Sequence, residues 1–535
     1  MSDPIERHDA LVVGAGFAGV YALHRLRTLG LNARAVEAGA DVGGTWYWNR
    51  YPGARCDTES MQYSYSFSDE IQQEWDWSEL YAAQPEILAY INFVVDRLAL
   101  RDHIDFNTCL SSLRYDAETA LWRAAFDDGR QVEATYCVMA TGCLSVPKVP
   151  DIEGLEHFQG RLLKTSEWPS ERPDFSADRV GLIGTGSSGI QTATTIAADC
   201  RQLTVFQRTP NYSVPANNRP MSQGYIKAWK SDYANRREQV RQTRNYTLYN
   251  NPGQRSGHEL TEQQLDTLLE AEWQIGGIGF LYAFNDVTRD REVNEAVARF
   301  VRKKIGEIVD DPDTAAVLAP SDYPIGAKRI CVDTGYYEIF NHDHVDVVDI
   351  KADPVAGVTE TGVRLNSGRE FELDTLVLAT GFDAMTGALS RIDIRGRDDL
   401  PLSQEWAAGP KTYLGLMVAD FPNLFLVTGP GSPSVFSNMV PSIEEHVDWI
   451  TETVADLERR QDQTVEPTRD AQEDWMAEVD AVSRRTLMRE ANSWYLGANV
   501  EGKPQVFMPY IGGSAVYARI LKQRTTNDME GFVFR

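Results

Sequence analysis

The sequence is poor in the residues that build metal and dithiol centres. Its 535 residues include eight histidines and six cysteines, and the cysteines stand at positions 56, 109, 137, 143, 200 and 331. No two cysteines have C-x-x-C spacing and no two histidines have H-x-x-x-H spacing. We therefore expect no metal site and no dithiol reductase, and the cysteines are typical of reduced thiols in a cytoplasmic protein.

Basic residues and long apolar segments are also scarce. Lys and Arg number 52 against 78 Asp and Glu, which gives a net charge of −26. Because phosphate contacts need clustered Lys and Arg, we expect no nucleic-acid partner. No apolar stretch reaches the ~18 residues that span a bilayer. The first predicted strand begins near residue 9, which leaves no room for a signal peptide. These absences favour a cytoplasmic protein without a membrane partner.

Glycine is plentiful, and two glycine-rich loops carry most of the information. Gly14-Ala15-Gly16-Phe17-Ala18-Gly19 follows the apolar run 10–13, and Gly184-Thr185-Gly186-Ser187-Ser188-Gly189 follows the apolar run 180–183. In such a loop the first glycine allows a tight turn from strand to helix. The second lets backbone N–H groups approach a pyrophosphate, and the third lets the helix pack on the sheet. We therefore predict two dinucleotide-binding domains.

The two loops differ in the residue that reads the ribose of the nucleotide. An acid some twenty residues beyond the first glycine accepts a hydrogen bond from the 2′-OH, whereas an arginine accommodates a 2′-phosphate. Glu37 stands 23 residues after Gly14, at the end of a predicted strand over 31–36. Arg208 stands 24 residues after Gly184, and the predicted strand before it leads to no acid. The first loop therefore predicts FAD or NAD, and the second predicts NADP(H).

The rest of the chain indicates how the two domains are connected. Buried strands that end in Ala-Thr-Gly, at 140–142 and 379–381, mark where the chain passes between nucleotide domains. Between the second loop and the second Ala-Thr-Gly we predict a helical insert. Its apolar residues recur at helical spacing, which we interpret as a core stripe: Val293, Val297, Phe300, Val301, Ile305 and Ile308. The Gly- and aromatic-rich segment 494–517 fits a loop that folds over a ligand and a well-packed tail equally.

An aromatic run follows the first loop. Residues 43–57 place Trp46, Tyr47 and Trp48 among glycines, with Asp57 at the end. Aromatic rings beside glycine can lie against a planar cofactor while the backbone hydrogen-bonds it. This pattern favours a cofactor-binding segment, although a buried aromatic cluster has the same composition.

With these motifs the chain resembles the type I Baeyer–Villiger monooxygenases, which carry FAD and use NADPH. The resemblance covers nearly the whole length, and the motifs that carry it are both phosphate loops, the run 43–57, Lys328-Arg329, the turn 379–383 and Ser493-Trp494-Tyr495. The segment 429–434, continuing to Asn438-Met439, is most similar to the phenylacetone and steroid monooxygenase branch.

The resemblance implies an oxygenase with Arg329 and Asp57 as its catalytic pair. NADPH would reduce FAD, and the flavin C4a-peroxide formed with O2 would attack a small-molecule ketone to give an ester or lactone. Arg329 would lie over the flavin, oriented by Asp57. An arginine suits this task because it stays charged and holds its donors in a planar fork.

The same resemblance assigns the cofactor contacts and the domains. For FAD it implies Gly14, Gly16, Gly19, Glu37, Thr45, Trp46, Trp48, Asp57, Tyr63 and Met439. For NADP it implies Gly184, Thr185, Gly186, Ser187, Ser188, Gly189, Arg208, Thr209, Lys328, Arg329 and Trp494, with Arg208 and Lys328 on the 2′-phosphate. The expected fold is α/β, with two Rossmann-like domains and a mainly helical insert. We expect the FAD domain to consist of residues 1–145 and 381–535, and the second of these parts to carry a C-terminal active-site loop. The NADP domain is expected to consist of residues 150–215 and 328–380, with the insert at 216–327.

One family motif departs from its pattern. The signature F-x-G-x-x-x-H-x-x-x-W begins at Phe158 and ends at Trp168, but Lys164 replaces the histidine. Trp168 and Pro169 still favour this family over N- and S-oxidising flavin monooxygenases. The missing imidazole removes the basis for a domain-coupling role, and Lys164 also fits a solvated surface residue. We expect activity to survive.

Two alternatives stay open at this stage. One is a flavin monooxygenase that oxidises nitrogen or sulfur. The other is an uncoupled NADPH oxidase or flavin sensor. The identity of the ketone, the selectivity and the choice between a monomer and a small homo-oligomer do not follow from the sequence.

Overall fold

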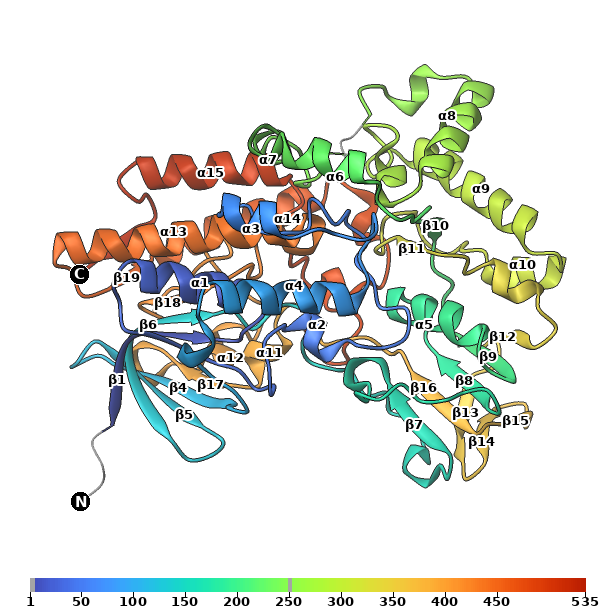
Figure 1. Ribbon diagram of the computed structural model, residues 1–535, viewed down its shortest axis with the longest axis horizontal. Coiled ribbons are helices and arrows are strands. Elements are labelled where there is room, and N and C mark those ends of the chain that lie inside the picture. The colour runs from blue at the N-terminus through green and yellow to red at the C-terminus, as the bar shows by residue number, and fades with distance from the viewer. Residues whose placement is uncertain (1–4, 249–252) are drawn as a thin grey trace.

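The computed structural model describes residues 5–248 and 253–535, and Figure 1 shows its two largest β-sheets in separate parts of the molecule. The larger sheet has the order β17-β4-β5-β6-β1-β2-β3, with β18 paired to β6. Its strands are β1 (Glu6–Val13), β2 (Ala33–Val36), β3 (Ile104–Asp105), β4 (Leu110–Asp116), β5 (Leu121–Phe126), β6 (Gln131–Met139), β17 (Asp393–Arg395) and β18 (Leu424–Leu426). We call this sheet with its helices the first nucleotide domain.

The second nucleotide domain has a wholly parallel sheet of five strands in the order β12-β9-β8-β16-β7. These strands are β7 (Arg161–Lys164), β8 (Arg179–Ile183), β9 (Gln202–Gln207), β12 (Val345–Asp349) and β16 (Thr375–Leu378). A small antiparallel sheet of β13 (Val355–Thr359), β14 (Gly362–Leu365) and β15 (Glu370–Glu372) packs against it through a shared apolar cluster. The larger sheet is mixed, with β1, β2, β3 and β6 parallel and β5 antiparallel to β4 and β6. Together with the parallel second sheet it confirms the predicted α/β class.

The strands follow their sequence signal because the sheets are covered on both faces. In β1 the last four residues are all buried, which is why the sequence shows an apolar run rather than alternation. Helices α1 (Phe17–Thr28), α4 (Gln84–Arg97) and α13 (Met439–Arg460) lie above this sheet in Figure 1. Helix α13 comes from the C-terminal part and packs on α1, where the Tyr21 hydroxyl donates to Asp448 Oδ1 at 2.7 Å.

The insert is helical, as predicted. It contains α6 (Gln223–Lys230), α7 (Tyr233–Arg241), α8 (Glu262–Ile275), α9 (Arg291–Ile308) and α10 (Pro312–Leu318). The predicted apolar stripe lies on α9, where all its members except the half-exposed Ile308 are buried in the core shared with the second nucleotide domain. Strands β10 (Ser213–Pro215) and β11 (Cys331–Asp333) pair in parallel and hold the two ends of the insert together.

The C-terminal part returns to the first nucleotide domain. After α13 it forms β19 (Val465–Pro467), α14 (Arg469–Ser483), the short helix η10 (Trp494–Leu496), α15 (Ser514–Thr526) and β20 (Phe532–Phe534). In segment 494–517, Tyr495, Phe507 and Met508 are buried in an apolar cluster with Met385 and Met488. The segment is therefore well packed, and Tyr495 also reaches the cavity described in the next subsection.

The two passages between the nucleotide domains run side by side. Residues 143–148 and 380–385 form an antiparallel ribbon in which Lys148 N donates to the Gly381 carbonyl at 2.9 Å and Asp383 N donates to the Val146 carbonyl at 2.9 Å. The Thr380 hydroxyl adds a bond to the Lys148 carbonyl at 2.7 Å. The chain therefore crosses between domains twice at one place.

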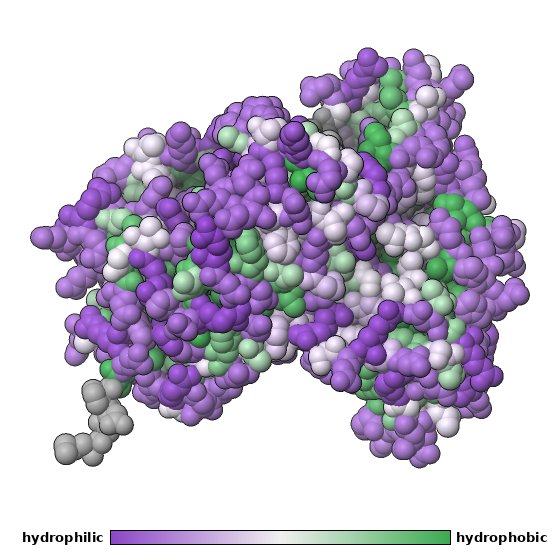
Figure 2. Space-filling model, in the orientation of Figure 1, coloured by the Kyte–Doolittle hydropathy of each residue, from purple (hydrophilic) through white to green (hydrophobic). Residues whose placement is uncertain are grey.

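The surface carries the excess of acidic and other hydrophilic side chains. On the face shown in Figure 2, hydrophilic residues dominate and hydrophobic ones form small separate areas. Across residues 5–248 and 253–535, no helix is both long and apolar enough to cross a membrane.

Both phosphate loops are built by the same close contacts. Gly14 and Gly184 have φ of +107° and +112°, in the left-handed region that favours glycine. A methyl group on Gly189 would lie 2.0 Å from the Gly184 carbonyl oxygen, closer than any relaxed contact. The position of Gly186 is different, because a methyl group there would meet no atom within 4 Å.

This contrast predicts different stabilities for two alanine variants of one loop. Gly189→Ala should push α5 (Ser187–Ala197) off β8 and lower the free energy of unfolding by about 1–3 kcal/mol, the usual cost of overpacking. Gly186→Ala should leave it close to the wild-type value. Thermal melting of the two FAD-loaded variants measures the difference, and equal midpoints would contradict the packing described here.

Candidate active site

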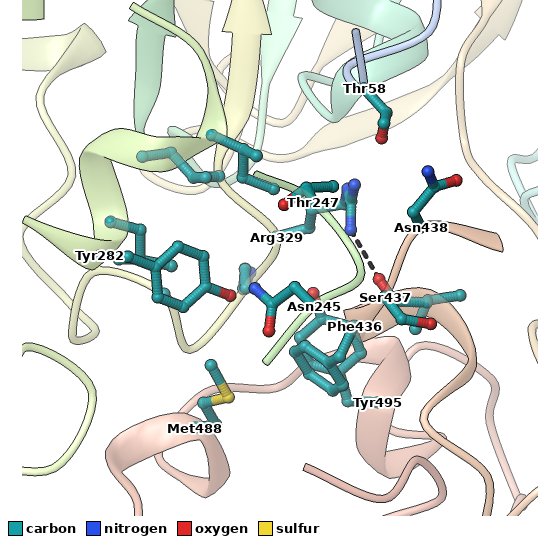
Figure 3. A pocket seen from close by; sticks show the side chains of 16 residues that line it. Thr58, Asn245, Thr247, Tyr282, Arg329, Phe436, Ser437, Asn438, Met488 and Tyr495 are labelled. Atoms are coloured by element: carbon teal, nitrogen blue, oxygen red, sulfur yellow. Dashed lines mark hydrogen bonds between the residues drawn. The ribbon is translucent and has the colours of Figure 1, made fainter. Parts of the chain in front are cut away.

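A cavity lies where the insert meets both nucleotide domains (Figure 3). About 470 Å³ of empty space, part of it open to solvent, lies within its lining. The insert contributes Asn245, Thr247, Ile278, Leu281 and Tyr282 to its lining, and the segment that follows contributes Gly326, Lys328, Arg329 and Ile330. The C-terminal part contributes Val435, Phe436, Ser437, Asn438, Met488 and Tyr495. Thr58, just after the aromatic run, completes the lining. The cavity wall thus combines segments that are far apart in the sequence.

Arg329 is held at this cavity by a bidentate ion pair with Asp57. Its Nε donates to Asp57 Oδ2 at 2.9 Å, and its Nη2 donates to Oδ1 at 2.9 Å and to Oδ2 at 2.7 Å. Nη1 donates to the Val435 carbonyl at 2.8 Å, the bond marked in Figure 3. The guanidinium is therefore fixed on two sides, and the sequence-predicted catalytic pair is in direct contact.

The charge of Arg329 is secured by its partner. Burial alone disfavours a charged guanidinium, but the negative charge and hydrogen bonds of Asp57 outweigh it and raise the pKa of Arg329 above its usual value. Arg329 is therefore a permanent, oriented positive charge beside the cavity.

A group of basic residues surrounds the end of β9. Arg208 follows this strand and is exposed. Burial lowers the pKa of Lys328, and the nearby charge of Arg208 lowers it further. The pKa of Lys148 is lowered by the same two causes in the same order. Three positively charged side chains therefore lie near one another at the end of β9.

The first loop presents the acid that the sequence predicts. Glu37 follows β2 and is 5% exposed. Its Oε2 accepts from Ala15 N at 2.8 Å and its Oε1 accepts from Gly39 N at 2.7 Å. The carboxylate therefore lies directly beside the glycine loop, where a ribose hydroxyl is expected.

The aromatic run forms a short helix, α2 (Thr45–Trp48), against the first loop. Trp46 is buried, and its Nε1 donates to the Tyr63 hydroxyl at 3.1 Å. Trp48 is 39% exposed, so the run is not simply a buried aromatic cluster. The run and the phosphate loop pack closely, because a methyl group added to Gly16 would lie only 3.3 Å from Gly44 Cα.

The donor sets of both loops fit dinucleotide phosphates. Helices α1 and α5 have Gly16 and Gly186 as their N-cap residues, and neither helix has a side-chain cap or an acid in its first turn. Elsewhere α8, α9 and α14 are capped by Thr261, Asp290 and Thr468. Uncapped backbone N–H groups at a helix N-terminus are the donors that a pyrophosphate needs.

Other predicted residues of the second loop make local contacts. Thr185 Oγ1 donates to the Thr209 carbonyl at 2.9 Å. Ser187 Oγ lies 3.5 Å from Cys331 Sγ, and the Ser188 side chain hydrogen-bonds Tyr51. These contacts bind the loop to the chain around it.

Most of the predicted site residues lie outside the cavity lining, which includes only Lys328 and Arg329 among them. Met439 is the first residue of α13, directly after the lining residue Asn438, and Trp494 is partly exposed beside Tyr495, with ring centroids 4.4 Å apart. Lys164 ends β7 and its Nζ pairs with Glu167 Oε2 at 3.0 Å near the surface, which matches the solvated alternative.

Sequence reasoning missed most of the cavity wall. Of the lining residues, it named only Lys328 and Arg329 as site residues. Asn245, Tyr282 and Met488 have no motif around them, because tertiary packing alone brings them to the cavity. Tyr495 could have been found, since it follows Trp494 in a motif already recognised.

Comparisons with known proteins agree with this geometry. A family profile described as pyridine nucleotide-disulphide oxidoreductase matches residues 8–235. A Baeyer–Villiger monooxygenase from Pseudooceanicola batsensis is 42% identical over 95% of this chain and 93% of its own length. A phenazine N-monooxygenase from Lysobacter antibioticus is 39% identical over 98% of this chain and 96% of its own length. The solved structure of an oxidised steroid monooxygenase bound to NADP has a TM-score of 0.95 and 46% identity, covering 99% of each chain.

Fold and site together define an FAD- and NADP-dependent flavoprotein monooxygenase. The chain belongs to the type I Baeyer–Villiger monooxygenases, which insert one oxygen atom of O2 beside a ketone carbonyl with NADPH as the hydride donor.

The ion pair predicts the effect of removing its negative partner. Asp57→Asn keeps the side-chain shape but loses the charge that orients Arg329, so ester formation per bound FAD should fall on the order of 10²-fold. Product analysis by gas chromatography with a cyclic ketone measures this effect.

Asp374→Asn is the matched control. Asp374 also holds an arginine in a bidentate pair, with Arg179 Nε and Nη2 each 3.0 Å from a carboxylate oxygen, but it lies before β16 and does not line the cavity. Its product yield per FAD should equal that of the wild type. Equal losses in both variants would assign the effect to stability and not to orientation.

Proposed function

We propose that Arg329, oriented by Asp57, is the catalytic residue for oxygenation of a small-molecule ketone in the cavity of Figure 3. The single observation that carries this proposal is the bidentate pair at the cavity wall. When bound, FAD and NADPH supply the reducing electrons and the activation of O2. The protein contributes orientation, fixed charge and exclusion of water.

The charge of Arg329 has one task in this proposal. As oxygen adds to a ketone, negative charge develops on the substrate's carbonyl oxygen. A positive group that is already oriented stabilises that charge without reorganising during the reaction. Because Asp57 and Val435 take up donors on two sides of the guanidinium, its orientation is set before the substrate arrives.

The cofactor contacts predicted from the sequence stay proposals. We propose that FAD lies along the first loop, with Glu37 on a ribose hydroxyl and α2 and Tyr63 beside the ring system. NADP(H) would lie along the second loop, with Arg208 and Lys328 on the 2′-phosphate. The uncapped helix N-termini and the charges around Arg208 support this arrangement.

The domain division is proposed on similar grounds. We assign 1–145 and 381–535 to the FAD domain because strands from both parts share one sheet. Residues 150–215 and 328–380 form the NADP domain around the second sheet, and 216–327 form the insert between β10 and β11. We also propose a cytoplasmic location, where the six cysteines would stay reduced.

Nitrogen oxidation is a second candidate function. The similarity to a phenazine N-monooxygenase over 98% of this chain favours it. An electron-rich nitrogen or sulfur atom needs an electrophilic oxygen donor, so a fixed positive charge at position 329 would matter less for that reaction.

Removing Arg329 should therefore separate the two functions. Arg329→Ala should lower lactone formation from a cyclic ketone on the order of 10²- to 10³-fold, the loss typical of an oxyanion donor. Oxidation of an alkyl aryl sulfide should fall much less. Products from both substrates, with H2O2 release measured alongside, test this. Lactone formation that survives the substitution would refute the assigned role, and complete conversion of NADPH to H2O2 in the wild type would indicate an uncoupled oxidase.

The cofactor assignment predicts a change of preference. Arg208→Ala removes a charge-assisted contact worth about 1.5–3 kcal/mol, so the KM for NADPH should rise about 10- to 100-fold while that for NADH changes little. Steady-state oxidation of both nucleotides measures it. Arg201→Ala, an exposed arginine of the same domain, is the control and should change neither KM. An unchanged preference in Arg208→Ala would place the 2′ reader elsewhere.

A further inference from the structure

A second cavity adjoins the first and has no role in the reaction as described. About 320 Å³ of empty space, part of it open to solvent, lies within its lining, and it shares Asn245, Tyr282, Phe436 and Met488 with the first cavity. The rest of its lining comes from the insert and the C-terminal part: Arg244, Thr288, Pro433, Tyr510, Ile511, Gly513 and Ser514. A substrate whose ketone lies in the first cavity therefore has an adjoining space for its remaining atoms.

Arg244 stands out on this wall because it has no acidic partner. Its only hydrogen bond from the guanidinium, among residues 5–248 and 253–535, is a long one from Nη2 to the Ile511 carbonyl at 3.4 Å. No carboxylate of those residues lies within ion-pair distance of it, and the stretch 249–252 contains no acid. In contrast, Arg291 of the same insert pairs with Glu490 at 2.6 Å.

The surroundings of Arg244 increase the need for an anion. Burial lowers the pKa of Arg244, the nearby Tyr282 side chain acts in the opposite direction, and the positive charge of Arg289 lowers the pKa again. A half-buried guanidinium beside a second arginine gains free energy when an anion enters and neutralises it. Since this chain carries 78 acidic residues, an arginine without one at a cavity wall is consistent with binding an acid from outside.

The residues of the cavity wall indicate which class of anion would bind there. The planar guanidinium fork matches a carboxylate in a bidentate arrangement. Asn245, Thr288 and Ser514 add neutral polar groups, while Phe436, Met488 and Ile511 supply apolar surface for a hydrocarbon chain. A short carbon chain that ends in a carboxylate fits both parts.

We propose that the second cavity binds a carboxylate through Arg244, so that the preferred substrate is an oxo acid whose ketone reacts beside Arg329. This inference rests on the proposed function and refines its substrate class. Arg244 is then a specificity residue, which touches the substrate away from the reacting carbonyl.

The test uses the FAD-loaded enzyme and a series of straight-chain methyl ketones that end in a carboxylate, each paired with its methyl ester. The chain length is varied because the reacting carbonyl and the carboxylate must fit both cavities at once. For the best length, kcat/KM for the oxo acid should exceed that for its ester by about 10- to 100-fold, the factor expected for a charged hydrogen-bonded contact. Arg244→Met should remove this advantage and leave the ester and an unsubstituted ketone close to their wild-type values.

Two further variants keep the result interpretable. Arg244→Lys retains the charge without the fork and should recover part of the preference. Arg291→Met removes one positive charge from an exposed site on the same insert, outside both cavities, and should keep the full preference. FAD content of each variant reports whether the protein is folded.

The outcomes separate this inference from the function on which it rests. If the wild type oxidises oxo acids and esters with equal kcat/KM, or if Arg244→Met loses both equally, the carboxylate site is refuted while ketone oxygenation stands. The first of these comparisons needs no variant. If the wild type converts no ketone of the series or of a neutral control panel, the proposed function fails and the inference fails with it.

Discussion

The ion pair between Asp57 and Arg329 is the interaction on which the rest of the site depends. Asp57 ends the aromatic run of the first nucleotide domain, and Arg329 lies in the segment that leaves the insert. The bond to Val435 adds the C-terminal part. Three distant segments thus meet at one guanidinium, which is costly to bury unless its partners are in place. The cavity can have its working shape only when the whole chain is folded around this charge.

The local features of the fold could be predicted from the sequence, because each depends on nearby residues. The glycine loops, the strands before them and the apolar face of α9 are set by spacing and periodicity. The contact of Asp57 with Arg329 spans 272 positions, so only the family resemblance indicated it. Asn245 and Tyr282 could not be assigned at all, since nothing in their neighbourhood distinguishes a cavity wall from an ordinary helical connection. Lys164 shows the reverse case, in which a changed motif residue turns out to lie at the surface with Glu167.

The distribution of positive charge links the two nucleotide domains to the cavities. In a chain with a net charge of −26, many arginines are held by acids at the surface, as Arg179 is by Asp374. Arg208, Arg244 and Arg329 are used differently. The first is exposed beside other basic residues, the second lines the second cavity without an acidic partner, and the third is fixed by its acid at the wall of the first cavity. Position, partner and exposure give one side-chain type three separate uses.

The paired passages between the nucleotide domains constrain how the enzyme can move. Two independent single-stranded linkers would let the domains separate, twist and slide. Here residues 143–148 and 380–385 are hydrogen-bonded to each other, so the two passages must bend together. A change in the angle between the two nucleotide domains therefore deforms both passages at once, so the paired segment resists such a change more than two separate linkers would.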